Sequence, residues 1–180
     1  MNDLLSGYRL GDSAICKLKI QLPNGAEMEW LPKTNQIIVW VTISEPNQPL
    51  DPRSRAIPAI VDTGFGANLL IGEYWLRQGV GLTPSKLCLR NDQVREFDTP
   101  NGKLKAQSWE LDIWGFPQIG GPVPKPSQLN PKRLGAMPRL VHVVPIGKPC
   151  PSLPLLGAGL FERIGMSLEI KAGLVNLSLG

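Results

Sequence analysis

A short apolar run that ends on a carboxylate constrains the fold of this chain more than any other feature. Residues Ile57 to Val61 are all apolar and include three β-branched side chains, which predicts a buried strand. The run leads directly into Asp62-Thr63-Gly64, so the strand delivers a carboxylate into a turn. Moving a charged group out of water costs free energy unless the group is paired. Asp62 is therefore the first candidate for a functional residue.

Short strands account for most of the remaining pattern. Apolar runs and alternating apolar residues predict strands at 14–22, 36–44, 56–62, 67–71, 86–90, 94–97, 103–106, 109–114, 139–146, 153–156, 167–170 and 174–177. The run at 36–44 is apolar enough to be covered on both faces. Helix is expected only as one turn at 73–78, before Gly79, and at Ala158–Ile164, before Gly165. We therefore predict an all-β fold.

Tight hairpins are predicted at two places. Asn101-Gly102 lies between two segments of strand type, and this dipeptide favours a tight turn because both positions tolerate φ > 0. Lys171-Ala172-Gly173 joins the last two strands into a closing hairpin.

Three segments carry loop signals. Met1–Gly11 is expected to be a loose lead-in, and the Pro- and Asp-rich residues 45–55 an exposed loop. Ten of the 24 residues at 115–138 are Pro or Gly, which predicts a long surface insertion and argues against a helix or a central strand. We expect residues 1–35 to form an N-terminal extension with a strand or hairpin, and residues 36–180 to form the main domain.

Composition limits the function classes. A chain of 180 residues has the length of one domain. Its net charge of +4 is spread thinly and no basic run is interleaved with aromatic residues, so we expect no nucleic-acid partner. The three cysteines lie far apart without the spacing of metal ligands, so neither a metal nor another cofactor is expected.

Localisation follows from the same data. An odd number of cysteines without a secretory signal indicates reduced thiols and a cytoplasmic protein. The sequence has no run of eighteen apolar residues, so no membrane-spanning segment is expected.

A second motif gives the Asp62 turn its context. Leu155-Leu156-Gly157 follows the strands and precedes the short helix. Together the two motifs resemble those of the retropepsin-like aspartic proteases, which are single-domain and homodimeric. The resemblance implies a closed, barrel-like β domain with a flap hairpin. It assigns catalysis to Asp62, support of the active site to Thr63 and Gly64, and contact with a peptide or protein substrate to the flap residues Thr99, Asn101 and Gly102.

The chemistry explains why such a protein would be a dimer. Two carboxylates that share one proton can activate a water with the ionised group and polarise the peptide carbonyl with the protonated group. This chain has a single Asp-Thr-Gly turn. The resemblance therefore implies a symmetric homodimer in which Asp62 of both protomers meets at the two-fold axis.

Three positions depart from the pattern of many viral relatives. Phe65 and Gly66 stand where those relatives have a small residue and then an acidic one, and Ala158 stands where they have an arginine. The ion pair that braces their dimer is therefore absent. This favours an alternative, in which the chain is a catalytically inactive binding or assembly module on the same fold.

Other functions find weaker support. Asp62 is also compatible with a structural role as a turn-capping aspartate. A thiol-protease pair of His142 with Cys88 or Cys150 has no local signature, so we expect a core or edge histidine and inert cysteines. An aspartyl-nucleophile phosphatase needs a second acidic residue where this chain has Gly64.

Overall fold

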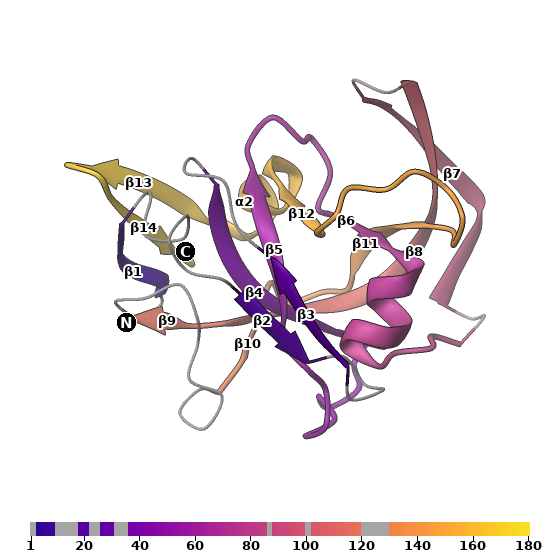
Figure 1. The fold of residues 1–180 in the computed structure, drawn as a ribbon, viewed down its shortest axis with the longest axis horizontal. Coiled ribbons are helices and arrows are strands. Elements are labelled where there is room, and N and C mark those ends of the chain that lie inside the picture. The colour runs from indigo at the N-terminus through magenta and orange to yellow at the C-terminus, as the bar shows by residue number, and fades with distance from the viewer. Residues whose placement is uncertain are drawn as a thin grey trace.

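The computed structural model describes residues 3–9, 18–21, 26–30, 36–85, 88–99, 102–119 and 130–180, and most of its regular secondary structure is strand (Figure 1). The strands are β1 (Asp3–Arg9), β2 (Leu18–Gln21), β3 (Glu27–Trp30), β4 (Ile37–Ser44), β5 (Ile57–Asp62), β6 (Leu69–Gly72), β7 (Leu89–Thr99), β8 (Gly102–Phe116), β9 (Gln118–Ile119), β10 (Lys132–Arg133), β11 (Arg139–Val144), β12 (Leu155–Gly157), β13 (Ser167–Lys171) and β14 (Leu174–Ser178). The helices are the π-helix η1 (Trp75–Val80) and α2 (Ala158–Ile164). The all-β prediction is confirmed.

The long strand β8 closes the main sheet on itself. Its middle part pairs with β11 and its last part pairs with β4, both antiparallel. Between these two partners the strand order is β11-β6-β12-β5-β4, so the sheet returns to β8 and forms a barrel. The first part of β8 extends beyond the barrel and pairs with β7, which forms the long hairpin at one end of the molecule (Figure 1).

Strand β4 shows why the barrel is stable. All eight of its residues are buried, as predicted from the continuous apolar run. Strand β5 starts buried and becomes half-buried at its end, so it leads from the core toward the surface. The main core joins these strands with β6, β8, β11, η1 and α2 in one apolar cluster.

The prediction of a loose lead-in at Met1–Gly11 is wrong. Strand β1 pairs antiparallel with β14 and parallel with β9, in a second sheet of order β13-β14-β1-β9. Leu4 and Leu5 are both buried and belong to the main core. Two adjacent apolar residues buried on opposite faces give no alternation, which is why the sequence pattern did not indicate a strand.

The prediction of a surface insertion at 115–138 is wrong at both ends. Gly115 lies inside β8, opposite Val41 on one side and Lys132 of β10 on the other. A side chain there would clash, because a Cβ on Gly115 would lie 2.6 Å from Leu4 Cδ2. Leu134 is buried as well. Residues 120–129 lie outside the described part of the chain.

The bounds of α2 match the prediction, whereas those of η1 match it only in part. Helix α2 has the predicted bounds and ends at Gly165, which has a φ of 64°. The expected turn at 73–78 is instead η1, which continues through Gly79 and ends at Gly81, where φ is 83°. Among the described residues, neither helix has the length and apolar content needed to cross a bilayer.

Each remaining predicted strand overlaps a strand of the structure where it is described, but β12 begins at Leu155 and not at Leu153. The predicted strands 103–106 and 109–114 form one continuous strand, β8, and those at 86–90 and 94–97 likewise fall on the single strand β7. The closing hairpin of β13 and β14 turns at Ala172 and Gly173, whose φ angles are 51° and 76°. The predicted strands around the Asn101-Gly102 turn belong to β7 and β8, although Asn101 itself lies outside the described residues. Strand β2 coincides with the described part of 14–22 and pairs with β3.

Candidate active site

The Asp62 turn begins where β5 leaves the barrel. Asp62 is half-buried, whereas Thr63 and Gly64 are exposed. The Gly64 N–H donates to Asp62 Oδ1 over 3.0 Å, and the Phe65 N–H donates to the Asp62 carbonyl oxygen over 3.1 Å. The bond from Gly64 therefore fixes the direction of the carboxylate, and the bond from Phe65 closes the backbone turn around it.

Strand β12 packs against this turn and holds it through backbone hydrogen bonds. It lies between β5 and β6, parallel to β5 with Gly157 opposite Asp62, and antiparallel to β6. The Gly157 N–H donates to the Asn68 carbonyl oxygen (2.9 Å), and the Ala158 N–H donates to the Phe65 carbonyl oxygen (2.8 Å). The second sequence motif thus binds both sides of the loop that follows Asp62.

Gly157 is required by the closeness of this contact. A Cβ at this position would lie 2.3 Å from the carbonyl oxygens of both Phe65 and Ala67. Real Cβ atoms do not approach backbone oxygens this closely, so any side chain would push β12 away from the turn. The glycine therefore determines how firmly the loop around Asp62 is held.

The predicted flap residues lie at the free end of the β7–β8 hairpin. Thr99 pairs with Gly102, and the Thr99 hydroxyl donates to the Gly102 carbonyl oxygen over 2.7 Å. Gly102 has a φ of 107°, a value that favours glycine. Thr99 and Gly102 also line a cavity of about 220 Å³ together with Pro149, Cys150 and Pro151 of the loop before β12.

A chain of aromatic contacts joins the Asp62 loop to this hairpin. The Phe65 and Phe97 ring centroids are 5.1 Å apart, and those of Phe97 and His142 are 5.2 Å apart with the rings edge to face. Beneath them is a small apolar cluster separate from the main core, formed by Leu70, Leu104, Ala106 and Val144. No local sequence signal indicates this connection, although Phe65 is an unusual residue to follow the Asp-Thr-Gly turn.

His142 is a core residue of β11 and not part of a thiol pair. It is 3% exposed, and its Nδ1 is hydrogen-bonded to the Ser108 hydroxyl over 3.1 Å. Burial, and to a smaller extent the Arg95 cation, lowers the pKa of His142 to about 4, so the ring is neutral above this pH. No hydrogen bond among the described residues joins His142 to a cysteine.

The two described cysteines lack the features of activated nucleophiles. Cys88 is buried, with its sulfur 3.5 Å from the Ser85 hydroxyl. Cys150 is exposed as a residue, but its sulfur lies close to Gly72, and partial burial raises the pKa of the Cys150 thiol to about 11. A reactive thiolate needs the opposite shift.

The candidate site therefore offers one oriented carboxylate. Within the described part of the chain, the Asp62 carboxylate forms no hydrogen bond with another acidic side chain, and no three metal-binding side chains cluster. A single carboxylate of this kind can take a proton from a water, but a second group must polarise the substrate carbonyl. The sequence matches no protein-family model, and a comparison with curated proteins finds no match either.

Proposed function

We propose that this chain is an aspartic endopeptidase of the retropepsin-like type, which hydrolyses peptide bonds as a homodimer. One observation carries the proposal: the Asp62 turn is clamped by a β12 backbone that only Gly157 permits. A turn that merely ends a strand needs no such support. A catalytic carboxylate does, because its position must be held within a fraction of an ångström.

In this proposal the two carboxylates have different tasks. Asp62 and Asp62 of the partner subunit share one proton across the two-fold axis. The ionised carboxylate takes a proton from the attacking water, while the protonated one donates to the carbonyl oxygen of the scissile peptide. Gly64 supplies the N–H that orients Asp62, and Thr63 holds the loop of its own protomer to that of the partner.

The hairpin of β7 and β8 closes over the bound peptide. Thr99 and Gly102, together with Asn101 between them in the sequence, would hydrogen-bond to the substrate backbone and exclude water. The cavity beneath the hairpin end is not lined by Asp62. A substrate cleft completed by the second protomer accounts for this, since half of its walls then come from the partner.

Substitution of Asp62 tests the proposal. We expect Asp62→Asn to abolish cleavage of a peptide library while leaving the thermal unfolding midpoint nearly unchanged, because the amide keeps an oxygen for the Gly64 N–H but cannot act as a base. Asp51→Asn, on an exposed loop, is the matched control and should retain activity. Cleavage retained by the Asp62→Asn protein would contradict the proposal.

The second candidate is an inactive binding or assembly module on the same fold. It is favoured by the packing of Phe65 against Phe97, which fills space beside the turn with an aromatic ring. This candidate predicts no turnover of any peptide in the library. A protein that stays monomeric at high concentration would favour it, because the carboxylate pair then cannot form.

A further inference from the structure

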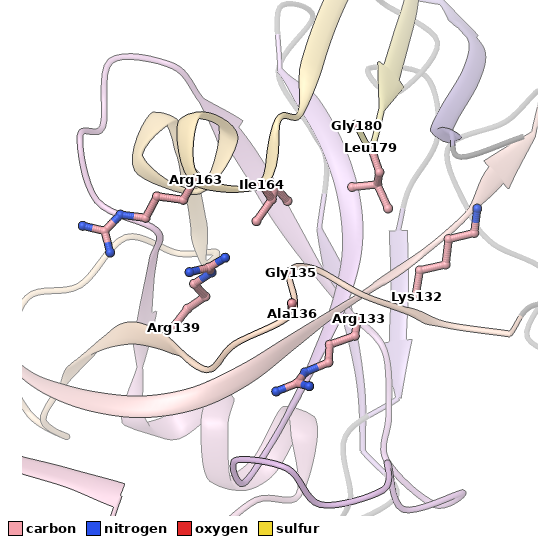
Figure 2. Close-up of a pocket in the computed structure, with 9 residues that line it drawn as sticks. All are labelled: Lys132, Arg133, Gly135, Ala136, Arg139, Arg163, Ile164, Leu179 and Gly180. Carbon is pink, nitrogen blue, oxygen red and sulfur yellow. The ribbon is translucent and has the colours of Figure 1, made fainter.

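A second hollow of the molecule lies away from the Asp62 turn and is lined by cations. This cavity of about 680 Å³ forms where β10, the start of β11, the last turn of α2 and the residues after β14 meet (Figure 2). Four of its nine lining residues are basic, namely Lys132, Arg133, Arg139 and Arg163, and none has an acidic side chain. Like charges around one cavity repel each other, so an anion in it would be stabilised.

Only one of the three arginines is neutralised by an ion pair in the described part of the chain. Arg133 Nη2 donates to Asp112 Oδ1 over 2.6 Å, and the Asp112 carboxylate is almost completely buried. The described residues provide no carboxylate within ion-pair distance of Arg139 or Arg163. Arg139 Nε is moreover buried without a hydrogen-bond acceptor there. A carboxylate bound to the Arg139 guanidinium from the cavity would offset part of this cost.

The turn at Gly135 positions the Arg139 guanidinium. Gly135 has a φ of 106°, and a Cβ on it would lie 2.6 Å from Arg139 Nη2 and 2.9 Å from Ile164 Cγ2. The bare turn therefore packs directly against the guanidinium and the end of α2. Figure 2 shows the Arg139 and Arg163 guanidiniums on the same side of this turn, while Ile164 and Leu179 give the cavity an apolar wall.

We propose that this cavity binds an acidic stretch of polypeptide. Its carboxylates would contact the planar guanidiniums of Arg139 and Arg163, which match carboxylate geometry, and a neighbouring apolar side chain would cover Ile164 and Leu179. The size of the cavity suits several groups better than a single ion. The inference goes beyond the proposed peptidase activity and does not depend on Asp62.

A nucleic acid fits the cavity less well than a peptide. None of the lining residues is aromatic, so the bases of a single strand find no stacking surface. A duplex would need a stripe of cations along its phosphates, whereas these cations surround one hollow with an apolar wall.

Binding of a labelled peptide with the sequence Glu-Glu-Leu-Glu-Glu, blocked at both ends, tests the proposal on the full chain. We expect saturable binding that weakens with added salt, and a loss of roughly tenfold or more in the double variant Arg139→Gln/Arg163→Gln, because charge-assisted hydrogen bonds are removed. The matched control Arg53→Gln/Lys171→Gln lowers the net charge equally, by two, and should bind within about twofold of the parent because neither residue lines the cavity. If Arg139→Gln impairs folding, the exposed single change Arg163→Glu should give the same loss.

Three further binding measurements distinguish a carboxylate ligand from the other candidates. The peptide with Gln in place of each Glu should not bind, an oligothymidine should bind more weakly than the acidic peptide, and inorganic phosphate should compete only weakly. Equal binding of the Gln peptide, tighter binding of the oligonucleotide, or an equal loss in the control variant would each overturn the proposal. Because the readout is binding, failure here leaves the test of Asp62 unaffected.

Discussion

Gly157 makes the strictest demand on side-chain identity among the residues around Asp62. Two carbonyl oxygens occupy the space that its Cβ would need. We predict that Gly157→Ala lowers the free energy of unfolding by about 3 kcal/mol or more, because a backbone that is already paired on both sides cannot move away cheaply. Chemical denaturation measures this loss directly.

Gly66 provides the control for this substitution. It lies in the same loop, but a Cβ there would meet no atom within 4 Å. Gly66→Ala should therefore change the stability little, by about 0.5 kcal/mol or less. Equal stability of the two variants would show that β12 does not hold the Asp62 loop in the way described.

His142 predicts a specific dependence of stability on pH. Its pKa is near 6.5 in the unfolded chain and about 4 in the folded protein. Between these values the unfolded chain binds a proton that the folded protein does not, so the free energy of unfolding decreases as the pH falls from about 6.5 to about 4. The free energy of unfolding should fall by about 3 kcal/mol over this range, because each unit of difference in pKa corresponds to about 1.36 kcal/mol.

Replacement of the ring isolates this contribution. The variant His142→Gln keeps a hydrogen-bonding group for Ser108. Its free energy of unfolding, measured at a series of pH values, should depend much less on pH between 6.5 and 4 than that of the parent. The variant is expected to be less stable at neutral pH, because the contact with Phe97 is lost. A slope unchanged by the substitution would assign the pH dependence to other groups.

The β7–β8 hairpin is the element that connects the Asp62 loop to the barrel core. Phe97 contacts Phe65 on one side and His142 on the other. We predict that Phe97→Ala lets the hairpin open locally, so that amide hydrogen exchange in β7 speeds up by about tenfold or more. If the chain is a peptidase, this variant should also have a raised KM, because the hairpin is no longer held over the peptide.

Val94 on the same strand is the matched control. It is 60% exposed and forms no part of the aromatic contacts. Val94→Ala should leave both hydrogen exchange and KM close to the parent values. A similar acceleration in both variants would mean that the hairpin is held by its strand pairing alone.

Elements with a local signal could be predicted from the sequence. The apolar run of β4, the run of β5 that ends on Asp62, and α2 before Gly165 are specified by residues close together in the chain. Strand β1 was missed because it is fixed by pairing with β14, at the opposite end of the sequence. The Pro and Gly content of 115–138 predicts a loop at Gly115, whereas the small size of Gly115 allows the close approach of Leu4 to β8.

The residues of the candidate site also fall into those with a local sequence signal and those without one. Asp62 and Gly157 were indicated by two short motifs, and the structure brings them opposite each other. The contacts of Phe65, Phe97 and His142 could not be predicted, because three separate strands and loops bring the rings together. The cationic cavity was hidden for the same reason, since its basic residues come from segments that look like an ordinary solvated surface in the sequence.

At the scale of the whole molecule, the proposed activity and the stability make opposite demands on pH. A carboxylate pair that must hold one proton favours an acidic solution. Burial of neutral His142 makes the folded protein less stable in acid. The acidic limit of any activity should therefore be set by unfolding of the barrel and not by the chemistry alone.

The central claim is that Asp62 acts only together with its counterpart in a second copy of the chain. Mixing the parent protein with an equal amount of Asp62→Asn protein, under conditions where subunits exchange, tests this most directly. Random pairing leaves both carboxylates in only about a quarter of the dimers, so the cleavage rate per parent chain should fall to about half. A rate per parent chain that the added Asp62→Asn protein leaves unchanged would contradict the account.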